Sequence, residues 1–568
     1  MPQRRVRGEA EPRGVPRSGG EKNFLEFMFP DADLRLPHIR TTCCFAMIFT
    51  LMYNLSANAI AFGLQVLTAS GHYDKDSGLI PGRGAVLGIA IAVLSFIVLL
   101  HTFSRRGGIL VNNAFAVVKV GGLLVMVCLA LAYAGGRFGG PGTAVRNNFT
   151  VDVWETNRSD VSSWSRSLTL CKYSFWGFEQ PFYILAEAKS PRKYFPKYTV
   201  LALLSTVLLY MLLNISYLLV VDKADIIPPF GEIPSSANMA TLFFDRLFGD
   251  DHKKASRAMA AIIAVSIFGN LWVMTFTAAR VKQEIAKEGI LPFSFYIATS
   301  YNTPYGIWRR RMSKTPVLDE EVEQAPTAAF GLHWFTSVLL IVLISPIVDP
   351  RKSYSALVSL YSYTVISLLG CWVSIGLLRV KLRKTRWHWQ ERRQYRPWLS
   401  PLHAIVFGMA TAFMLIAAFI PPGPDSPFLK SVTGIAWYIV PVVGISAPLW
   451  GMLWYWGLLC YEWKIGRHLV VSREAYWQPD PDCPGEFAQQ AEIIDHTWQI
   501  TLRSEMVNDF ERSHAIAEKL EGSAIEQQRH SMDGDDPRLE GLGRGNKNLA
   551  RAHRVPMMSE RRLSDSFE

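Results

Sequence analysis

Hydrophobic residues along this chain gather into long runs separated by short polar stretches. Each run has about twenty residues, the length at which a helix crosses a hydrocarbon core of about 30 Å. The pattern predicts an all-α polytopic membrane protein rather than a series of soluble domains. Ten spans are expected, at residues 41–68, 84–103, 109–134, 164–186, 199–221, 256–279, 327–348, 354–379, 402–421 and 434–461.

Lysine and arginine are concentrated in alternate loops between these spans, at residues 105–106, 189–197, 280–314 and 379–396. Basic loops stay on the cytoplasmic side of a membrane, which orients the spans and places both termini in the cytoplasm. The same loops explain the net charge of +11, so no nucleic-acid partner is needed to account for it.

The ends of the chain differ in composition from its middle. Residues 1–40 are interpreted as a cytoplasmic N-terminal segment, 41–461 as the transmembrane domain and 462–568 as a cytoplasmic tail. The first 22 residues contain no apolar core of a signal peptide. The tail beyond about residue 520 is polar and without periodicity, which predicts that it is largely disordered.

Motifs for metal binding or catalysis are not found. The seven cysteines have no metal-ligand spacing, and no cofactor motif or catalytic cluster stands out. The sequence therefore predicts neither an enzyme nor a bound cofactor. An ion channel also lacks support, because there is no repeated pore loop or charged ring.

The fourth predicted span contains Gly177, Glu179 and Pro181 among apolar residues. Pro181 removes a backbone donor and Gly177 eases local unwinding, so the helix is expected to be interrupted. Unpaired peptide groups cannot face lipid, so the interruption must line a cavity or contact protein, as in transporters. A carboxylate at this depth is costly and predicts a functional site; the alternative is that Glu179 bonds to neighbouring helices as a packing or gating element.

Two other polar residues lie inside apolar spans. Lys119 is well beyond the start of its span at Ile109. Burial disfavours the charged form of an amine, so Lys119 could gain and lose a proton during transport. The alternative is a permanently charged lysine paired with a carbonyl or carboxylate. Asn270 follows Gly269 in the sixth span and either contacts substrate or bonds to another helix.

Two segments of the chain resemble a known transporter family. Gly177-Phe-Glu179 with Tyr183-Ile-Leu-Ala-Glu-Ala-Lys-Ser-Pro191 resembles the sixth span and following loop of the amino acid–polyamine–organocation transporters. Phe268-Gly-Asn270 with the stretch from Ala279 to Phe293 is similar to their eighth span and loop. The likeness is closest to the fungal high-affinity methionine permeases of the L-type amino acid transporter branch. Residues Gly20–Glu26 resemble the segment that these permeases have just before their third span.

The resemblance implies an inverted-repeat transporter fold, with two five-helix units followed by two peripheral helices. In the family the interrupted sixth span binds the amino group of the substrate through exposed carbonyls. Lys119 matches a fifth-span lysine that replaces a sodium ion in some proton-driven relatives, although exchangers and uniporters also occur in the superfamily. The implied substrate-binding residues are Ser174, Phe175, Gly177, Phe178, Glu179 and Asn270, with Lys119 for proton coupling.

The chain departs from the family pattern at its beginning. Family members have twelve spans, and the first contains a glycine-rich break that holds the substrate carboxylate. The first span of this chain, from Thr41, matches the third span of the family, and residues 1–19 are too charged to supply two more. The chain is therefore expected to lack the first two spans, through a truncated gene model or as a shortened form.

The interrupted span and the resemblance together predict amino-acid uptake across the plasma membrane by alternating access, and the resemblance implies a neutral, methionine-like substrate and coupling to protons. The expected partners are the amino acid, protons and the lipid bilayer. The alternatives are a transporter-like amino-acid sensor or regulatory membrane protein, and a truncated, inactive permease.

Overall fold

The computed structural model describes residues 17–30, 38–72, 82–140, 142, 145–146, 148–149, 161–188, 191–226, 239–248, 252–313, 322–346, 349–382, 398–421, 435–479 and 487–500. The disorder predicted beyond about residue 520 falls outside these residues.

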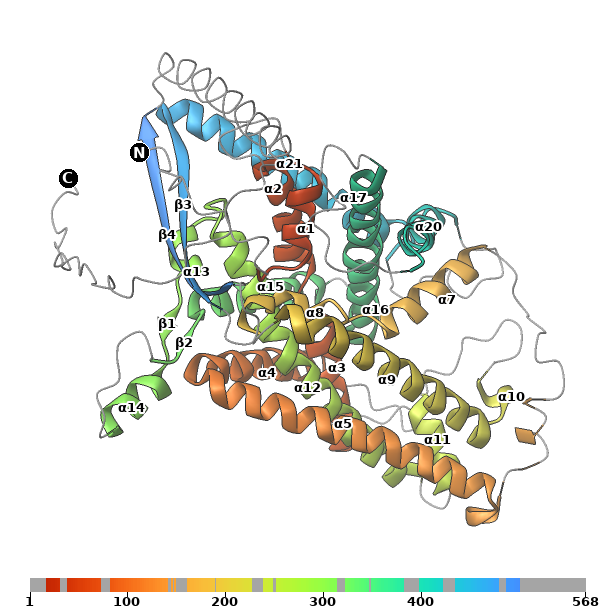
Figure 1. Cartoon of the computed structure of the whole chain (residues 1–568). Helices are drawn as coiled ribbons and strands as arrows, with labels where there is room; N and C mark the ends of the chain where they lie inside the picture. The colour runs from red at the N-terminus through yellow and green to blue at the C-terminus, as the bar shows by residue number, and fades with distance from the viewer. Residues whose placement is uncertain are drawn as a thin grey trace, which may run out of the picture. The chain divides into compact units, whose positions relative to one another are not determined.

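Helices form most of the predicted spans (Figure 1). Eight helical segments among the described residues are long and apolar enough to cross a membrane. The first and the seventh of these segments each contain a π-helical turn, η1 or η5. The elements are α2 (Ile39–Met47), η1 (Ile48–Met52) and α3 (Ser56–Ala69); α4 (Arg83–Phe103); α5 (Arg105–Ala134); α9 (Pro191–Val220); α12 (His252–Ala286); α15 (Thr327–Ile344); α16 (Pro350–Tyr361), η5 (Ser362–Leu369) and α17 (Gly370–Leu382); and α21 (Ile439–Ile465).

Two of the ten predicted spans are not among these eight. The fourth is divided into α7 (Val161–Ser174) and α8 (Gln180–Tyr183), on either side of the interruption. The ninth forms α20 (Leu402–Ala417), whose 16 residues make a helix of about 24 Å, shorter than a typical hydrocarbon core. The described residues thus supply eight full-length helices where the sequence predicts ten.

The helix α3 lies at the centre of the packing. It contacts α4, α12 and α16, and the cluster at these contacts includes the buried residues Ile60, Val93 and Leu271. In contrast, α5 and α9 run side by side (Figure 1) and leave Val117 and Leu204 more than half exposed. Large apolar side chains exposed along a helix of this length are suited to contact with lipid.

Short elements connect and cover the long helices. A two-residue antiparallel pair, β1 with β2, holds the loop around α14. The C-terminal pair β3 and β4 is a long antiparallel hairpin that aligns Arg467 with Ile500. The bounds are α1 (Glu21–Met28), η2 (Arg137–Gly139), η3 (Leu185–Glu187), α10 (Lys223–Ile226), α11 (Met239–Leu247), α13 (Ser294–Ala298), β1 (Tyr301–Asn302), α14 (Pro304–Met312), β2 (Gln324–Ala325), β3 (Arg467–Pro479) and β4 (Phe487–Ile500).

The hairpin is attached to the end of α12 by a buried group of charges. The Arg473 guanidinium lies 2.6 Å from Glu288, 2.8 Å from Glu492 and 3.1 Å from Glu284. Lys287 contacts Glu492 at 2.8 Å. Burial by itself raises the pKa of Glu492, but Lys287 and Arg473 outweigh it and lower that pKa to about 2. The attachment is therefore electrostatic and depends on ionised carboxylates.

Candidate substrate-binding site

The interruption predicted in the fourth span is present. The helix α7 ends at Ser174, and residues 175–179 form turns before α8 begins at Gln180. Gly177 has φ +126°, a conformation that favours glycine because it has no Cβ. Its N–H donates to Oε2 of Glu179 at 2.9 Å. The local sequence thus explains the break through the backbone freedom of one glycine and one internal hydrogen bond.

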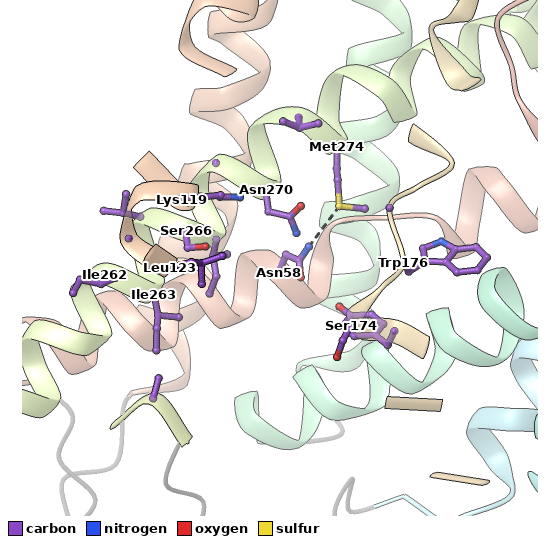
Figure 2. Close-up of a pocket in the computed structure, with 18 of the residues that line it drawn as sticks. Asn58, Lys119, Leu123, Ser174, Trp176, Ile262, Ile263, Ser266, Asn270 and Met274 are labelled. Carbon is purple, nitrogen blue, oxygen red and sulfur yellow. Dashed lines mark hydrogen bonds between the residues drawn. The ribbon is translucent and has the colours of Figure 1, made fainter. Parts of the chain in front are cut away.

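A cavity of about 1260 Å³ lies against this interruption. Its lining comes from the interrupted segment α7–α8 and from α3, α5, α9, α11, α12 and α16, with Asn54 just before α3, and most of the lining side chains are apolar. Figure 2 shows polar side chains that different helices contribute to the cavity: Asn58, Lys119, Ser174, Ser266 and Asn270. The polar residues of the lining are Asn54, Asn58, Lys119, Ser174, Glu179, Gln180, Ser266 and Asn270, together with Tyr173, Tyr210, Tyr217 and Tyr361.

Five of the seven predicted site residues line this cavity: Lys119, Ser174, Gly177, Glu179 and Asn270.

Phe175 and Phe178 are not among the lining residues. The Phe175 ring lies 4.9 Å from the ring of Tyr210, and the Phe178 ring lies 5.1 Å from that of Trp176. The turn therefore directs Trp176 to the cavity and uses the two phenylalanines in aromatic contacts.

Glu179 is buried, with 2% of its surface exposed. Besides the bond from Gly177, its Oε1 accepts a hydrogen bond from the Gln180 amide at 3.0 Å. Both carboxylate oxygens are thus used close to the interruption, where they hold the turn in shape. This arrangement gives Glu179 a local structural role, and its contact with substrate stays a prediction.

Lys119 and Asn270 face each other across the contact of α5 with α12 (Figure 2). A Cβ on Gly269 would lie 3.1 Å from Cε of Lys119, so a glycine at that position makes room for the lysine stem. No ion pair joins Lys119 to a carboxylate in the part of the chain that the structure describes. A proton-exchanging role for Lys119 stays a prediction.

The sequence did not predict a second interruption, in the first span. After η1, Tyr53 has ψ 86° and the helix resumes only at Ser56. The Asn54 side chain donates to the carbonyls of Leu51 and Met52 and accepts from the Ser56 N–H at 3.0 Å. A signal was available, because Asn54 and a second asparagine lie four residues apart on one face of an apolar run.

That second asparagine, Asn58, also lines the cavity, where its amide nitrogen lies 3.9 Å from Sδ of Met274 (Figure 2). The two interruptions meet at this cavity, since both Asn54 and Gly177 line it. A helical membrane protein with two interrupted spans beside a cavity lined by polar and apolar residues is the arrangement expected of a transporter.

The family model described as amino acid permease matches residues 12–447 of the chain. The chain belongs to this family, which confirms the resemblance to the amino acid–polyamine–organocation superfamily.

The individual relatives share about a quarter of their aligned residues with this chain. The chain is 26% identical over 478 residues to the high-affinity methionine permease of Saccharomyces cerevisiae, covering 82% of this chain and 72% of that protein. It is 26% identical over 410 residues to the low-affinity methionine permease of the same yeast, covering 71% and 65% of the two chains. With solute carrier family 7 member 13 of Homo sapiens it shares 26% identity over 287 residues, about half of each chain, at 49% and 49%.

Family and structure together define a mostly helical polytopic integral membrane protein, as the sequence predicts, with the β3–β4 hairpin added after the last long helix. They also indicate a transporter rather than an enzyme. The ten-span count, the orientation of the termini and the division into three segments stay predictions.

Proposed function

We propose that this chain carries a neutral, methionine-like amino acid into the cell across the plasma membrane by alternating access, coupled to protons. The observation that supports this most directly is the interrupted span α7–α8 beside the cavity of about 1260 Å³. Membership of the amino acid permease family and the likeness to methionine permeases support the substrate class.

The amino group of the substrate binds at the end of α7. The last carbonyls of a helix have no partner within it and carry partial negative charge, which attracts an ammonium group. The end of α7 at Ser174 lies at the cavity, and the turn that follows cannot continue the helical hydrogen bonds. Backbone carbonyls near Ser174 and Gly177 are therefore the proposed ligands of the amino group.

The apolar part of the cavity receives the substrate side chain. Trp176, Met274 and Tyr361 line it, and the thioether of methionine packs favourably against aromatic rings. A charged side chain would lose its hydration against these apolar and aromatic groups. This lining supports a neutral and fairly bulky substrate.

Lys119 provides the proton site. It lies on α5 against Gly269 and Asn270 of α12, at the cavity but without a described carboxylate partner. A change in its charge alters how α5 packs on α12, which links protonation to the shape of the cavity. Proton binding and substrate transport are then coupled through the contact between α5 and α12.

Uptake of labelled L-methionine by cells that express the full chain tests this function. The expected result is saturable uptake above that of cells carrying an empty vector, faster at acidic external pH and reduced by other neutral amino acids in excess. Absence of uptake of methionine and of every other neutral amino acid, with the protein present at the cell surface, contradicts the proposal.

A further inference from the structure

The Gln180 side chain connects three parts of the cavity wall. Its amide nitrogen donates hydrogen bonds to the hydroxyl of Tyr53 and to Oε1 of Glu179, the latter at 3.0 Å. Its amide oxygen accepts a hydrogen bond from the hydroxyl of Thr277. Gln180 is the first residue of α8, Tyr53 follows η1, and Thr277 is on α12.

The residue type fits these partners closely. A carboxamide donates and accepts at the same time without carrying a charge, which a carboxylate or an apolar side chain cannot do. Tyr53 is fully buried and Thr277 is 3% exposed, so water does not readily replace the amide there. Loss of the amide would take away the partner that the buried Tyr53 hydroxyl has on α8, whereas the Thr277 hydroxyl would keep only its long bonds, 3.3 Å each, to the carbonyls of Val273 and Met274 on its own helix.

The position of Gln180 relates it to both interruptions. It follows the break between α7 and α8, while Tyr53 belongs to the break between η1 and α3. Thr277 lies one helical turn from Met274, which lines the cavity on the same helix. The amide therefore ties the second half of one interrupted span to the other interrupted span and to the α12 wall.

We propose that Gln180 is a positioning residue for transport, which holds α8 against α12 and keeps the interruption in its substrate-binding shape by acting through Tyr53, Thr277 and Glu179. This inference rests on the proposed transport function. It assigns Gln180 to the conformational step and not to direct contact with the amino acid, although the residue lies at the cavity.

Gln180→Met tests the proposal because methionine is close in size to glutamine and lacks the amide. In uptake of labelled L-methionine, corrected for the amount at the cell surface, the maximal rate falls at least about tenfold while KM changes less than about threefold. The matched control is Gln324→Met at the exposed residue Gln324 of β2, which leaves both values unchanged. A raised KM at an unchanged maximal rate would show direct substrate contact and overturn the proposal, as would no change in either.

The partner residue gives a second comparison. Thr277→Val removes the hydroxyl that donates to Gln180 and lowers the maximal rate of uptake in the same direction. Because the two changes remove one shared bond, adding Thr277→Val to Gln180→Met lowers the rate little further. Fully independent effects of the two substitutions would contradict a shared role.

A labelling experiment decides the inference without transport. With a cysteine at Met274 on the cavity wall, Gln180→Met lets α8 part from α12, so a small maleimide reacts at least about threefold faster. The same chain without Met274→Cys measures the background from the native cysteines. Equal labelling with glutamine and methionine at position 180 overturns the inference. If the unmodified chain transports no amino acid, the proposed function fails while this measurement still decides whether Gln180 holds α8 against α12.

Discussion

At the scale of single residues, the candidate site depends on backbone conformations that only certain side chains allow. Gly177 is the clearest case, because its φ of +126° is strained for any residue with a Cβ. No heavy atom lies within 4 Å of a Cβ built there, so the strain comes from the backbone and not from crowding.

Gly177→Ala is therefore expected to destabilise the turn by about 1–3 kcal/mol and to reduce methionine uptake strongly. The matched control is Gly121→Ala in α5, where a Cβ also meets nothing within 4 Å and the backbone is helical. Thermal unfolding of the purified protein and initial uptake rates measure the two effects. Equal uptake by the two variants would show that the conformation of Gly177 has no part in transport.

The second prediction at this scale concerns Lys119 and proton coupling. Lys119→Met keeps the length of the side chain and removes its charge, so uptake is expected to lose its dependence on external pH between about pH 5 and pH 8. Lys464→Met at an exposed position near the end of α21 is the control and keeps the dependence. An unchanged pH profile in Lys119→Met would exclude this lysine as the coupling residue.

At the scale of elements, the attachment of the β3–β4 hairpin to α12 depends on Arg473. Its guanidinium is close to three carboxylates, and its side chain is only 14% exposed. Arg473→Ala removes the cation that the three carboxylates share and leaves them Lys22 and Lys287, so the cost is at most that of a fully broken buried pair, about 3–5 kcal/mol. Limited proteolysis is expected to cut the hairpin sooner in this variant than in Arg467→Ala, whose side chain is exposed. Equal cutting would contradict an electrostatic attachment.

The same attachment is expected to weaken in acid. Burial alone would raise the pKa of Glu492, but the charges of Lys287 and Arg473 outweigh burial and lower this pKa from an ordinary value of 4.5 to about 2. A carboxyl group with a lowered pKa stabilises the folded state fully above its ordinary pKa, and this contribution is lost as the pH falls from there towards the folded-state value. The protection factors of the β4 amides, which correct hydrogen exchange for its intrinsic pH dependence, should thus be high at neutral pH and lower near pH 3. Protection that does not change over this range would argue against the carboxylates.

The two interrupted spans show which local features could be predicted from the sequence and which could not. The break in α7–α8 could be predicted because Gly177 and Pro181 are visible in an apolar run. The break at Tyr53 has neither glycine nor proline beside it. Its backbone is held by Asn54 and by the Ser337 hydroxyl of α15, which accepts a hydrogen bond from the Leu55 N–H at 3.3 Å. Contacts between residues so far apart in the chain cannot be derived from a local pattern.

At the scale of the whole molecule, the predicted spans and the membrane class follow from hydrophobic run length, which lipid thickness imposes on any helix. The cavity does not, because it arises where α3, α5, α12 and the two interruptions face one another. Lys119, Glu179 and Asn270 could be singled out as polar residues in apolar runs, whereas the directions of Phe175 and Phe178 depend on the turn around Gly177.

Binding of labelled L-methionine to the purified full chain tests the central claim most directly, because the interrupted span is proposed to hold the substrate's amino group through backbone carbonyls near Ser174 and Gly177. The account predicts saturable binding that unlabelled L-methionine competes away and that 4-(methylthio)butanoic acid, which lacks the amino group, does not. Competition by both compounds at the same concentration, or no saturable binding at all, would contradict it.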